Sequence, residues 1–234
     1  MPDSSTIFVK AEPAPLEAAG LRWLAAAGAR VPRIVADTPE RLVLQRIEQG
    51  SIDPDGEEDL GRMLAALHRA GAPHVGSLPA PGRFFVGRCE LDSPVDVSDD
   101  WNGYYLQHRC LPLARRVGLA GVVERIRVDA PSEPVARLHG DLWSGNVLGD
   151  RDGRAWLIDP AAYGGHREMD LAMLDLFGRV PDRTRAAYHE VWPLADGWPE
   201  RVELWQLFPL LVHAMLFGGD YLRRAGGLAL RLAR

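Results

Sequence analysis

The chain has 234 residues, of which 47% are hydrophobic and 25% are charged, so it is long and apolar enough to fold around a sizeable core. Its 27 basic and 32 acidic residues give a formal net charge of -5, which argues against nucleic acid as a partner, since a phosphate-backbone binder needs a clustered positive field. The most apolar stretch, residues 204–217, is too short and too polar to span a membrane. With only two cysteines and no signal-peptide pattern, the sequence predicts a cytoplasmic protein without membrane partners.

The start of the chain predicts a short strand followed by a helix. Residues 6–10 form a β-branched and aromatic run that is typical of a strand, with Lys10 at its end. An apolar stripe over residues 15–27 has helical spacing and stops at a glycine. Glu17 begins a row beside this stripe, so we expect its side chain to point inward.

Two further strands and a break in pattern complete this first part of the chain. Residues 32–35 and 42–47 are short apolar runs separated by turn-forming residues, which predicts a second and a third strand. Residues 48–56 are polar and rich in turn formers. We therefore expect the boundary between two lobes within that segment.

Most of the remaining chain predicts helices, with one exception at its centre. Short apolar pieces at residues 135–138, 147–148 and 155–158 indicate strands, and the loop between the last two has hairpin composition. Helical spacing of apolar residues predicts the other elements, over residues 60–68, 101–117, 170–177 and 202–221.

The motif HGDLWSGN, residues 139–146, falls on the loop that enters this hairpin, and Asp159 follows its second strand. Asp141 and Asn146 are five residues apart, so both side chains and Asp159 can converge at one end of the hairpin. Phosphoryl transfer needs such a set: a carboxylate that orients or deprotonates the acceptor hydroxyl, and oxygen ligands for magnesium. His139 is expected to be structural, bonded to the backbone of the metal site.

Lys10 and Glu17 supply the other requirement, a cation for the phosphates held by an ion pair. Strand lysine, helix glutamate, Asp-x-x-x-x-Asn loop and metal aspartate follow in the order of the kinase template. Taken singly, a lysine at a strand end and a glutamate on a helix are usually solvated charges, so the order of the whole set carries the interpretation.

Three motifs resemble those of the fructosamine kinase (ketosamine kinase) family, a branch of the protein-kinase-like fold related to aminoglycoside phosphotransferases and choline kinases. The first is HGDLWSGNV, the second is IDPAAYGGHREMDLAMLDLFG at residues 158–178, and the third is LFPLLVHAMLFGGDYL at residues 207–222. The HGD-x-x-x-x-N and ID signals are common to all these kinases, whereas WSGN and YGGHREMDLA resemble the fructosamine kinase branch specifically.

The resemblance implies an α+β, two-lobe kinase-like fold. Its small nucleotide-binding lobe, with the hinge, would comprise residues 1–48, and its mainly helical catalytic lobe would comprise residues 49–234. The activity implied is the ATP- and magnesium-dependent 3-phosphorylation of the sugar part of a ketosamine, either a small molecule or a glycated amine. This would serve deglycation or metabolite repair.

Carried over by position, Asp141 resembles the catalytic aspartate, Asn146 and Asp159 the magnesium ligands, and Lys10 with Glu17 the phosphate-binding pair. Residues 45–47, Gln45, Arg46 and Ile47, resemble the hinge that receives adenine on backbone groups. Gln45 stands where an acidic residue is common, a change that backbone contacts would tolerate. Positions around the acceptor side of the family correspond to Trp143, Tyr163, His166, Glu168, Trp101 and Arg109.

One departure from the family pattern lies before Lys10. Only nine residues precede it and none is glycine, whereas a kinase-like small lobe has two strands and a glycine-containing loop there. Either the recorded start is internal to a longer product, or the lobe is reduced. A reduced lobe keeps open a pseudokinase-like nucleotide-binding module that lost turnover with this loop. A kinase of aminoglycosides or other hydroxyl compounds is a further alternative, which concerns the acceptor.

Overall fold

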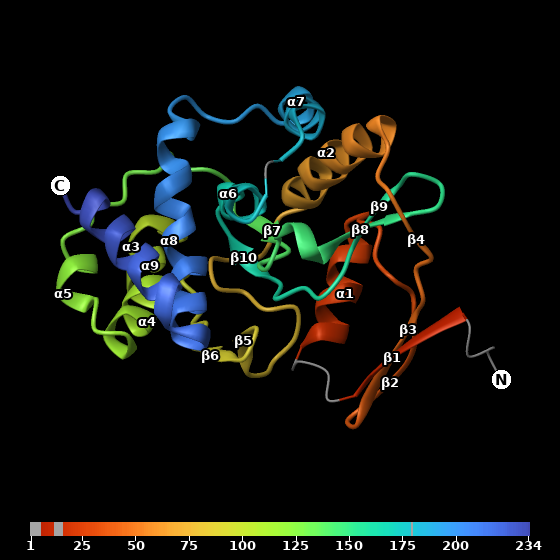
Figure 1. The fold of residues 1–234 in the computed structure, drawn as a ribbon, viewed down its shortest axis with the longest axis horizontal. Coiled ribbons are helices and arrows are strands. Elements are labelled where there is room, and N and C mark those ends of the chain that lie inside the picture. The colour runs from red at the N-terminus through yellow and green to blue at the C-terminus, as the bar shows by residue number, and fades with distance from the viewer. Residues whose placement is uncertain (1–5, 12–15, 179) are drawn as a thin grey trace.

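The computed structural model describes residues 6–11, 16–178 and 180–234. It has a small antiparallel sheet carrying one helix, joined to a larger, mainly helical part (Figure 1). The sheet order is β1-β3-β2, and its members are β1 (Ile7–Ala11), β2 (Ile34–Thr38) and β3 (Arg41–Gln45). The three strands predicted from the sequence are thus confirmed, with small shifts of their bounds.

Helix α1 (Glu17–Ala26) covers this sheet through a small core of its own. Leu21 packs there with Leu42 and Leu44, all at most 5% exposed. The predicted helix is confirmed over its described part, and its expected first residue, at position 15, lies outside the described residues.

The polar segment after the sheet is more ordered than the expected loop. Strand β4 (Gln49–Gly50) pairs with β8 (Val147–Asp150), and the Asp53 side chain caps α2 (Pro54–Arg69) by accepting a hydrogen bond from the Gly56 N–H at 2.7 Å. A Cβ at Gly50 would lie 2.3 Å from the Asp150 carbonyl oxygen, so glycine permits this close pairing. Whether the chain divides into lobes at residue 48 stays a prediction.

The central hairpin is confirmed. Strand β8 (Val147–Asp150) pairs with β9 (Ala155–Leu157), and β7 (Ala136–Leu138) pairs with β10 (Tyr163–Gly165), which the sequence did not predict. The Asp150 carboxylate holds the β8–β9 turn. Hydrogen bonds from Trp156 and Arg154 lower the pKa of this carboxyl to about 2.

Helices form the rest of the molecule. The helical spacing predicted within residues 202–221 is confirmed, and it is divided between two helices: α8 (Trp198–Phe217) ends because Gly218 turns the chain with a φ of 62°, and α9 (Gly219–Leu232) follows. The β5–β6 hairpin and α7 were also not predicted. The remaining elements are β5 (Phe84–Val86), β6 (Cys89–Leu91), α3 (Trp101–Tyr104), a π-helical turn (Tyr105–Cys110), α4 (Leu111–Arg116), α5 (Ala120–Val123), α6 (Glu168–Leu176), α7 (Asp182–Val191), α8 (Trp198–Phe217) and α9 (Gly219–Leu232).

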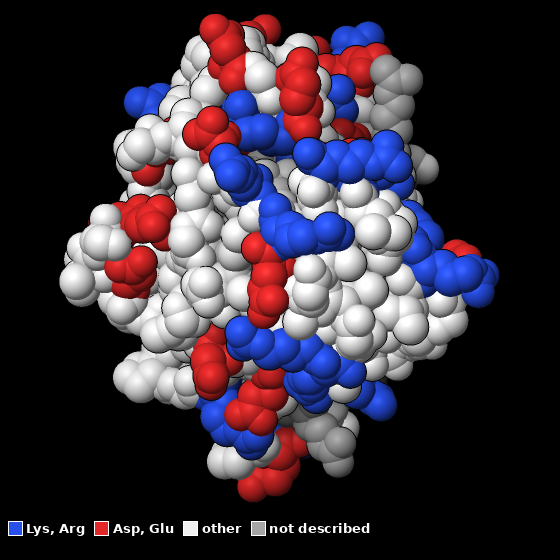
Figure 2. Space-filling model, turned by 90° about the vertical axis from the view of Figure 1, so that its left-hand side faces the viewer, with Lys and Arg blue, Asp and Glu red and all other residues white. Residues whose placement is uncertain are grey.

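Helix α8 runs through the main core, where Trp205, Leu207 and Leu211 are fully buried. Despite this apolar character, no helix in the described ranges is long and apolar enough to cross a membrane. On the side of the molecule that carries α5 and α9, basic and acidic side chains are interspersed (Figure 2). Helix α9 contributes ion pairs there, such as Arg231 with Glu203 at 2.8 Å.

Candidate active site

The loop from β7 to β8 carries Asp141 and is shaped by the residue before it. Gly140 has a φ of 81°, and a Cβ on it would lie 1.9 Å from the Ala161 carbonyl oxygen. Only glycine fits this conformation and this space. The backbone conformation therefore requires the glycine of the HGD motif, independently of the role of its aspartate.

Asp170, on α6, anchors this loop, and the sequence reasoning missed it. Its carboxylate accepts hydrogen bonds from the backbone N–H groups of His139 at 2.7 Å and Gly140 at 2.9 Å. It also lies 3.2 Å from Nε2 of His68, whose Nδ1 is 2.8 Å from the Tyr188 hydroxyl. Burial would raise the pKa of Asp170, but the His68 contact and the backbone donors hold it below its usual value. The signal in the sequence was a carboxylate between apolar residues, Met169 and Leu171, in a helix with apolar spacing.

His139 is structural, as predicted. Its Nε2 is 2.9 Å from the Ile158 carbonyl oxygen, which only accepts, and its Nδ1 is 3.3 Å from the Asp141 N–H, which only donates. These partners assign a neutral ring with its proton on Nε2. Burial lowers the pKa of His139, consistent with that state. The ring thus ties the Asp141 loop to the backbone immediately before Asp159.

Asp141 and Asn146 are held together within the loop. The Asn146 amide donates to the Asp141 carbonyl oxygen at 2.8 Å and to its carboxylate at 3.2 Å. Burial, with the charges of Asp159 and Asp170, raises the pKa of Asp141 to about 6, against the lowering effect of Asn146. A carboxylate with this pKa is ionised at neutral pH and is a better proton acceptor than an ordinary aspartate.

Lys10 links the small sheet to the hairpin. Its Nζ lies 2.8 Å from Glu17 Oε2 and 3.1 Å from Asp159 Oδ1. Burial opposes its charge, but the two carboxylates raise the pKa of Lys10 above its usual value, so it stays cationic. The structure therefore contains the expected ion pair with Glu17, and it brings Asp159 to the same ammonium group.

The residues predicted to hold magnesium fit such an ion. Both amide hydrogens of Asn146 face acceptors on Asp141, so the amide oxygen is left for another ligand. The Asp159 side chain is half exposed. The backbone φ of Asp159 is 53°, which turns the chain at the end of the hairpin. Magnesium typically takes one or two such protein oxygens and completes its shell with water and phosphate.

A cavity of about 720 Å³ lies between the small sheet and the hairpin. Asp159 and the hinge residues 45–47 line it, so it joins the polar groups to the predicted hinge. Its apolar lining, suited to a flat heteroaromatic ring, comes from Phe8, Pro32, Leu44, Leu148 and Ile158.

The hinge offers fewer backbone donors than the sequence suggested. The Gln45 N–H donates to the Arg33 carbonyl at 2.8 Å, and the Arg46 N–H donates to the Thr6 carbonyl at 2.9 Å. Within the described part of the chain, the Ile47 N–H has no hydrogen-bond partner. Of the three predicted hinge residues, Ile47 is therefore the one that has a free N–H for a ring nitrogen.

Trp143 is the candidate on the acceptor side that reaches the surface. Its side chain is 38% exposed two residues after Asp141, and it meets Phe177 edge-on with ring centroids 6.1 Å apart. His213 continues this contact, 4.7 Å from Phe177. We call the resulting row of rings the aromatic rim; the sequence reasoning missed its members beyond Trp143, which are Phe177, His213, Phe217 and Tyr221.

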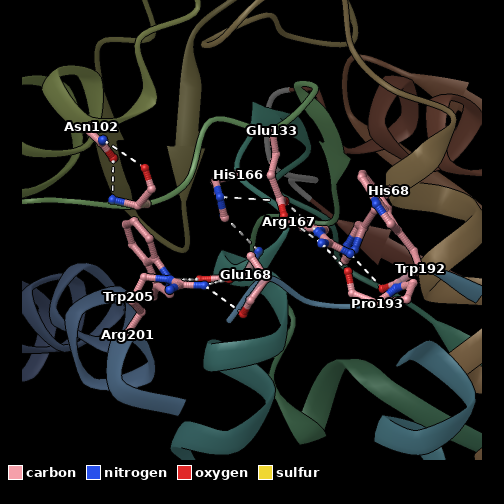
Figure 3. A network of polar contacts seen from close by, with 12 residues as sticks. His68, Asn102, Glu133, His166, Arg167, Glu168, Trp192, Pro193, Arg201 and Trp205 are labelled. Atoms are coloured by element: carbon pink, nitrogen blue, oxygen red, sulfur yellow. Dashed lines mark hydrogen bonds and ion pairs between the residues drawn. The ribbon is translucent and has the colours of Figure 1, made fainter. Parts of the chain in front are cut away.

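The other predicted acceptor-side residues lie in the interior, and their role toward an acceptor stays a prediction. Arg109 is fully buried, and its guanidinium stacks over the Tyr163 ring at 4.4 Å. Glu168 is fully buried and pairs with Arg201 and the Trp205 indole (Figure 3). The physical reason is that these side chains pack into the core, where Arg109 stacks on aromatic rings and Glu168 is paired, although single polar atoms of the other three and the Nε of Arg109 have no hydrogen-bond partner among the described residues. The remaining two, Trp101 and His166, line a different pocket.

Comparison with known proteins agrees with this geometry. The family model for fructosamine kinase matches residues 7–232. A Thermus thermophilus protein named "Probable ketoamine kinase" is 40% identical over 213 residues, which are 88% of this chain and 77% of that protein. An Enterococcus faecium protein of the same name is 34% identical, with the same coverage.

Solved structures give the fold. A Thermobifida fusca protein named "putative fructosamine-3-kinase" superposes with a TM-score of 0.85 at 40% identity, covering 97% of this chain and 85% of that one. A choline/ethanolamine kinase family protein from Mesorhizobium loti has a TM-score of 0.58 at 18% identity, covering 98% and 82%. The latter is similar in fold alone.

These findings define the class of the protein: it has a protein-kinase-like fold and is a phosphotransferase that acts on a hydroxyl group. Within that class, the chain belongs to the fructosamine kinase family. The fold class and the family resemblance inferred from the sequence are confirmed.

Proposed function

We propose that the protein transfers the γ-phosphoryl group of ATP to the 3-hydroxyl of a ketosamine. The observation that carries this proposal is that Asn146 binds Asp141, while Lys10 binds Asp159, which lines the large cavity. Family membership supports a sugar-amine acceptor, and the 3-position follows from the family resemblance. Phosphorylation there would serve deglycation, and two buried, unpaired cysteines fit a reducing cytoplasm.

Each residue has a distinct task in this reaction. Asp141 orients the acceptor hydroxyl and takes its proton. Lys10, fixed between Glu17 and Asp159, places a positive charge at the phosphates. Asn146 and Asp159 would hold magnesium, which when bound neutralises charge on the phosphate oxygens.

The direct test is phosphate transfer from ATP and magnesium to a fructosamine or ribulosamine, followed by ADP release. An aminoglycoside and choline serve as competing acceptors. Turnover restricted to ketosamines is expected. Stabilisation of the fold by ATP and magnesium without transfer to any acceptor would instead indicate a nucleotide-binding module.

Replacing Lys10 by methionine should weaken the use of ATP. The neutral side chain keeps a similar length but leaves the phosphates and the buried Glu17 without their cation. We expect kcat/KM for ATP to fall by about 100-fold, since a single electrostatic contact to a reacting group is typically worth this much. Steady-state kinetics with varied ATP measure it, and Arg22→Met, at an exposed ion pair on α1, is the matched control. Equal kinetics of both variants would contradict the role of Lys10.

Replacing Trp143 by alanine should weaken the acceptor and spare the nucleotide. The exposed ring stands next to Asp141 and can stack on a sugar. We expect KM for the ketosamine to rise about tenfold, equivalent to about 1.4 kcal/mol. KM for ATP should stay within about twofold. The control is Trp143→Phe, which keeps an aromatic ring at this position. An unchanged acceptor KM in Trp143→Ala would contradict this placement.

A further inference from the structure

A second pocket lies at the end of the β7–β10 pair that is remote from the catalytic loop. Tyr163 pairs with Leu138, next to that loop, whereas Gly165 pairs with Ala136 at the other end. The pocket lies at this Gly165 end and has a volume of about 190 Å³. None of its lining residues lines the nucleotide cavity.

Two buried N–H groups belong to the lining of this pocket. Trp101 is 7% exposed, and its indole Nε1, which can only donate, has no hydrogen-bond partner among the described residues. His166 is 4% exposed, and its Nδ1 accepts the Glu168 N–H at 3.3 Å. Burial lowers the pKa of His166, while the charges of Glu168 and Glu133 and the Pro131 carbonyl only partly offset this. The neutral ring therefore carries its proton on Nε2.

That second N–H also has no partner with the geometry of a hydrogen bond among the described residues, although the Pro131 carbonyl acts on the ring strongly enough to oppose the lowering of its pKa. In Figure 3 the His166 ring points toward Glu133, which lines the same pocket, but the Nε2 to Oε2 distance is 3.7 Å and too long for a hydrogen bond. Glu133 is itself bound on both oxygens by Arg167, at 2.6 Å each. An unpartnered buried donor is costly, so the interior of the pocket favours a ligand with an oxygen acceptor.

The mouth of the pocket is acidic. Asp99 and Asp100 are both exposed, and each uses one carboxylate oxygen to accept a backbone N–H, from Val75 at 3.0 Å and from Gly103 at 3.3 Å. His74 lies 3.5 Å from the same oxygen of Asp99. The pocket lining includes no lysine and no arginine among the described residues. The negative charge of Asp99 and Asp100 therefore repels carboxylates and phosphates and attracts an ammonium group.

We propose that this pocket binds a small ammonium compound that also carries hydroxyl or carbonyl oxygens, such as an amino sugar or an amino alcohol. The ammonium group lies at Asp99 and Asp100, and an oxygen accepts hydrogen bonds from Trp101 and His166. The volume equals that of about six waters in the liquid, which suits a ligand of this size. The proposal does not rest on the ketosamine reaction.

The test is a titration with D-glucosamine followed by the indole N–H signals of the seven tryptophans in a ¹H–¹⁵N spectrum. The Trp101 signal is assigned by backbone-linked experiments and by its loss in Trp101→Phe. It should shift with saturation in the millimolar range, and D-glucose, which lacks the ammonium group, should bind at least about tenfold more weakly. The Trp143 signal reports separately on any binding at the catalytic loop.

A double variant, Asp99→Asn with Asp100→Asn, removes the charge and keeps the local backbone. Asparagine caps helices as well as aspartate does, and it tolerates the positive φ of 55° at position 99. The affinity of this double variant for glucosamine should fall at least about tenfold. The control double variant, Glu40→Gln with Asp220→Asn, makes an equal charge change elsewhere and should leave the affinity unchanged. A Trp101 signal that stays still up to about 50 mM glucosamine, or an affinity that the double variant retains, would overturn the proposal.

Discussion

Asp141→Asn should reduce turnover of the ketosamine by about 1000-fold or more. The amide keeps the size of the carboxylate and can still contact Asn146, but it cannot take the proton of the acceptor hydroxyl. Removal of a general base typically costs about 100- to 10,000-fold. Steady-state kcat measures the loss, and titration with ATP and magnesium should show that nucleotide binding is retained.

The control for this variant is Asp152→Asn, in the exposed turn of the β8–β9 hairpin. Asp152 pairs with Arg154 and lies on the same hairpin, so the control tests for a general effect of charge loss there. It should keep kcat within about twofold. A kcat for Asp141→Asn within about tenfold of the wild-type value would refute Asp141 as the group that takes the proton.

The pH dependence of the wild-type enzyme should show the same group. Because only the ionised carboxylate accepts a proton, and burial raises the pKa of Asp141 to about 6, kcat/KM should fall as the pH decreases through about 6 and level off above it. The Asp141→Asn variant should lose this acidic limb. An increase in kcat/KM on acidification would contradict the role of Asp141 as a base.

The largest effect on stability is expected for Asp170→Ala. The variant leaves the N–H groups of His139 and Gly140 and the ring of His68 without their shared acceptor in the core. Losing one partner of such a buried set costs about 3–5 kcal/mol, equivalent to a decrease in Tm of about 10 °C for a chain of this size. Thermal unfolding measures it, and activity should fall as well because the Asp141 loop loses its anchor.

Lowering the pH should remove part of the stabilisation that the Asp170 carboxylate gives to the wild-type protein. The folded-state pKa of Asp170 lies below its ordinary value, so its stabilisation is complete above the ordinary range of an aspartate and is lost as the pH falls through the lower folded value.

The control for Asp170→Ala is Asp220→Ala, at an exposed ion pair on α9, which should cost less than about 1 kcal/mol. Equal losses in the two variants would contradict the anchoring role.

The proposed catalytic segment was predictable because its residues are close in the sequence. Asp141 and Asn146 lie on one loop, and Asp159 follows the hairpin that this loop enters, so a motif and two predicted strands were enough to group the three. Lys10 and Glu17 were found from their order along the chain, and the structure places their charged groups 2.8 Å apart.

Residues that act across the fold were harder to assign. Asp170 contacts the loop from a helix 30 residues away, and His213 joins the aromatic rim from α8, which no local pattern indicates. Conversely, no local pattern showed that Arg109 and Glu168 lie in the core, where Arg109 stacks on the Tyr163 ring and Glu168 pairs with Arg201. Partners in tertiary structure decide such cases, and a single sequence does not specify them.

The most direct test of the central claim is ³¹P and ¹³C NMR of the product formed from ATP, magnesium and a fructosamine. The account predicts a phosphomonoester on the sugar O3, formed by the wild-type protein and not by Asp141→Asn. A phosphate on another oxygen, ATP hydrolysis without a sugar phosphate, or equal product from both proteins would contradict it.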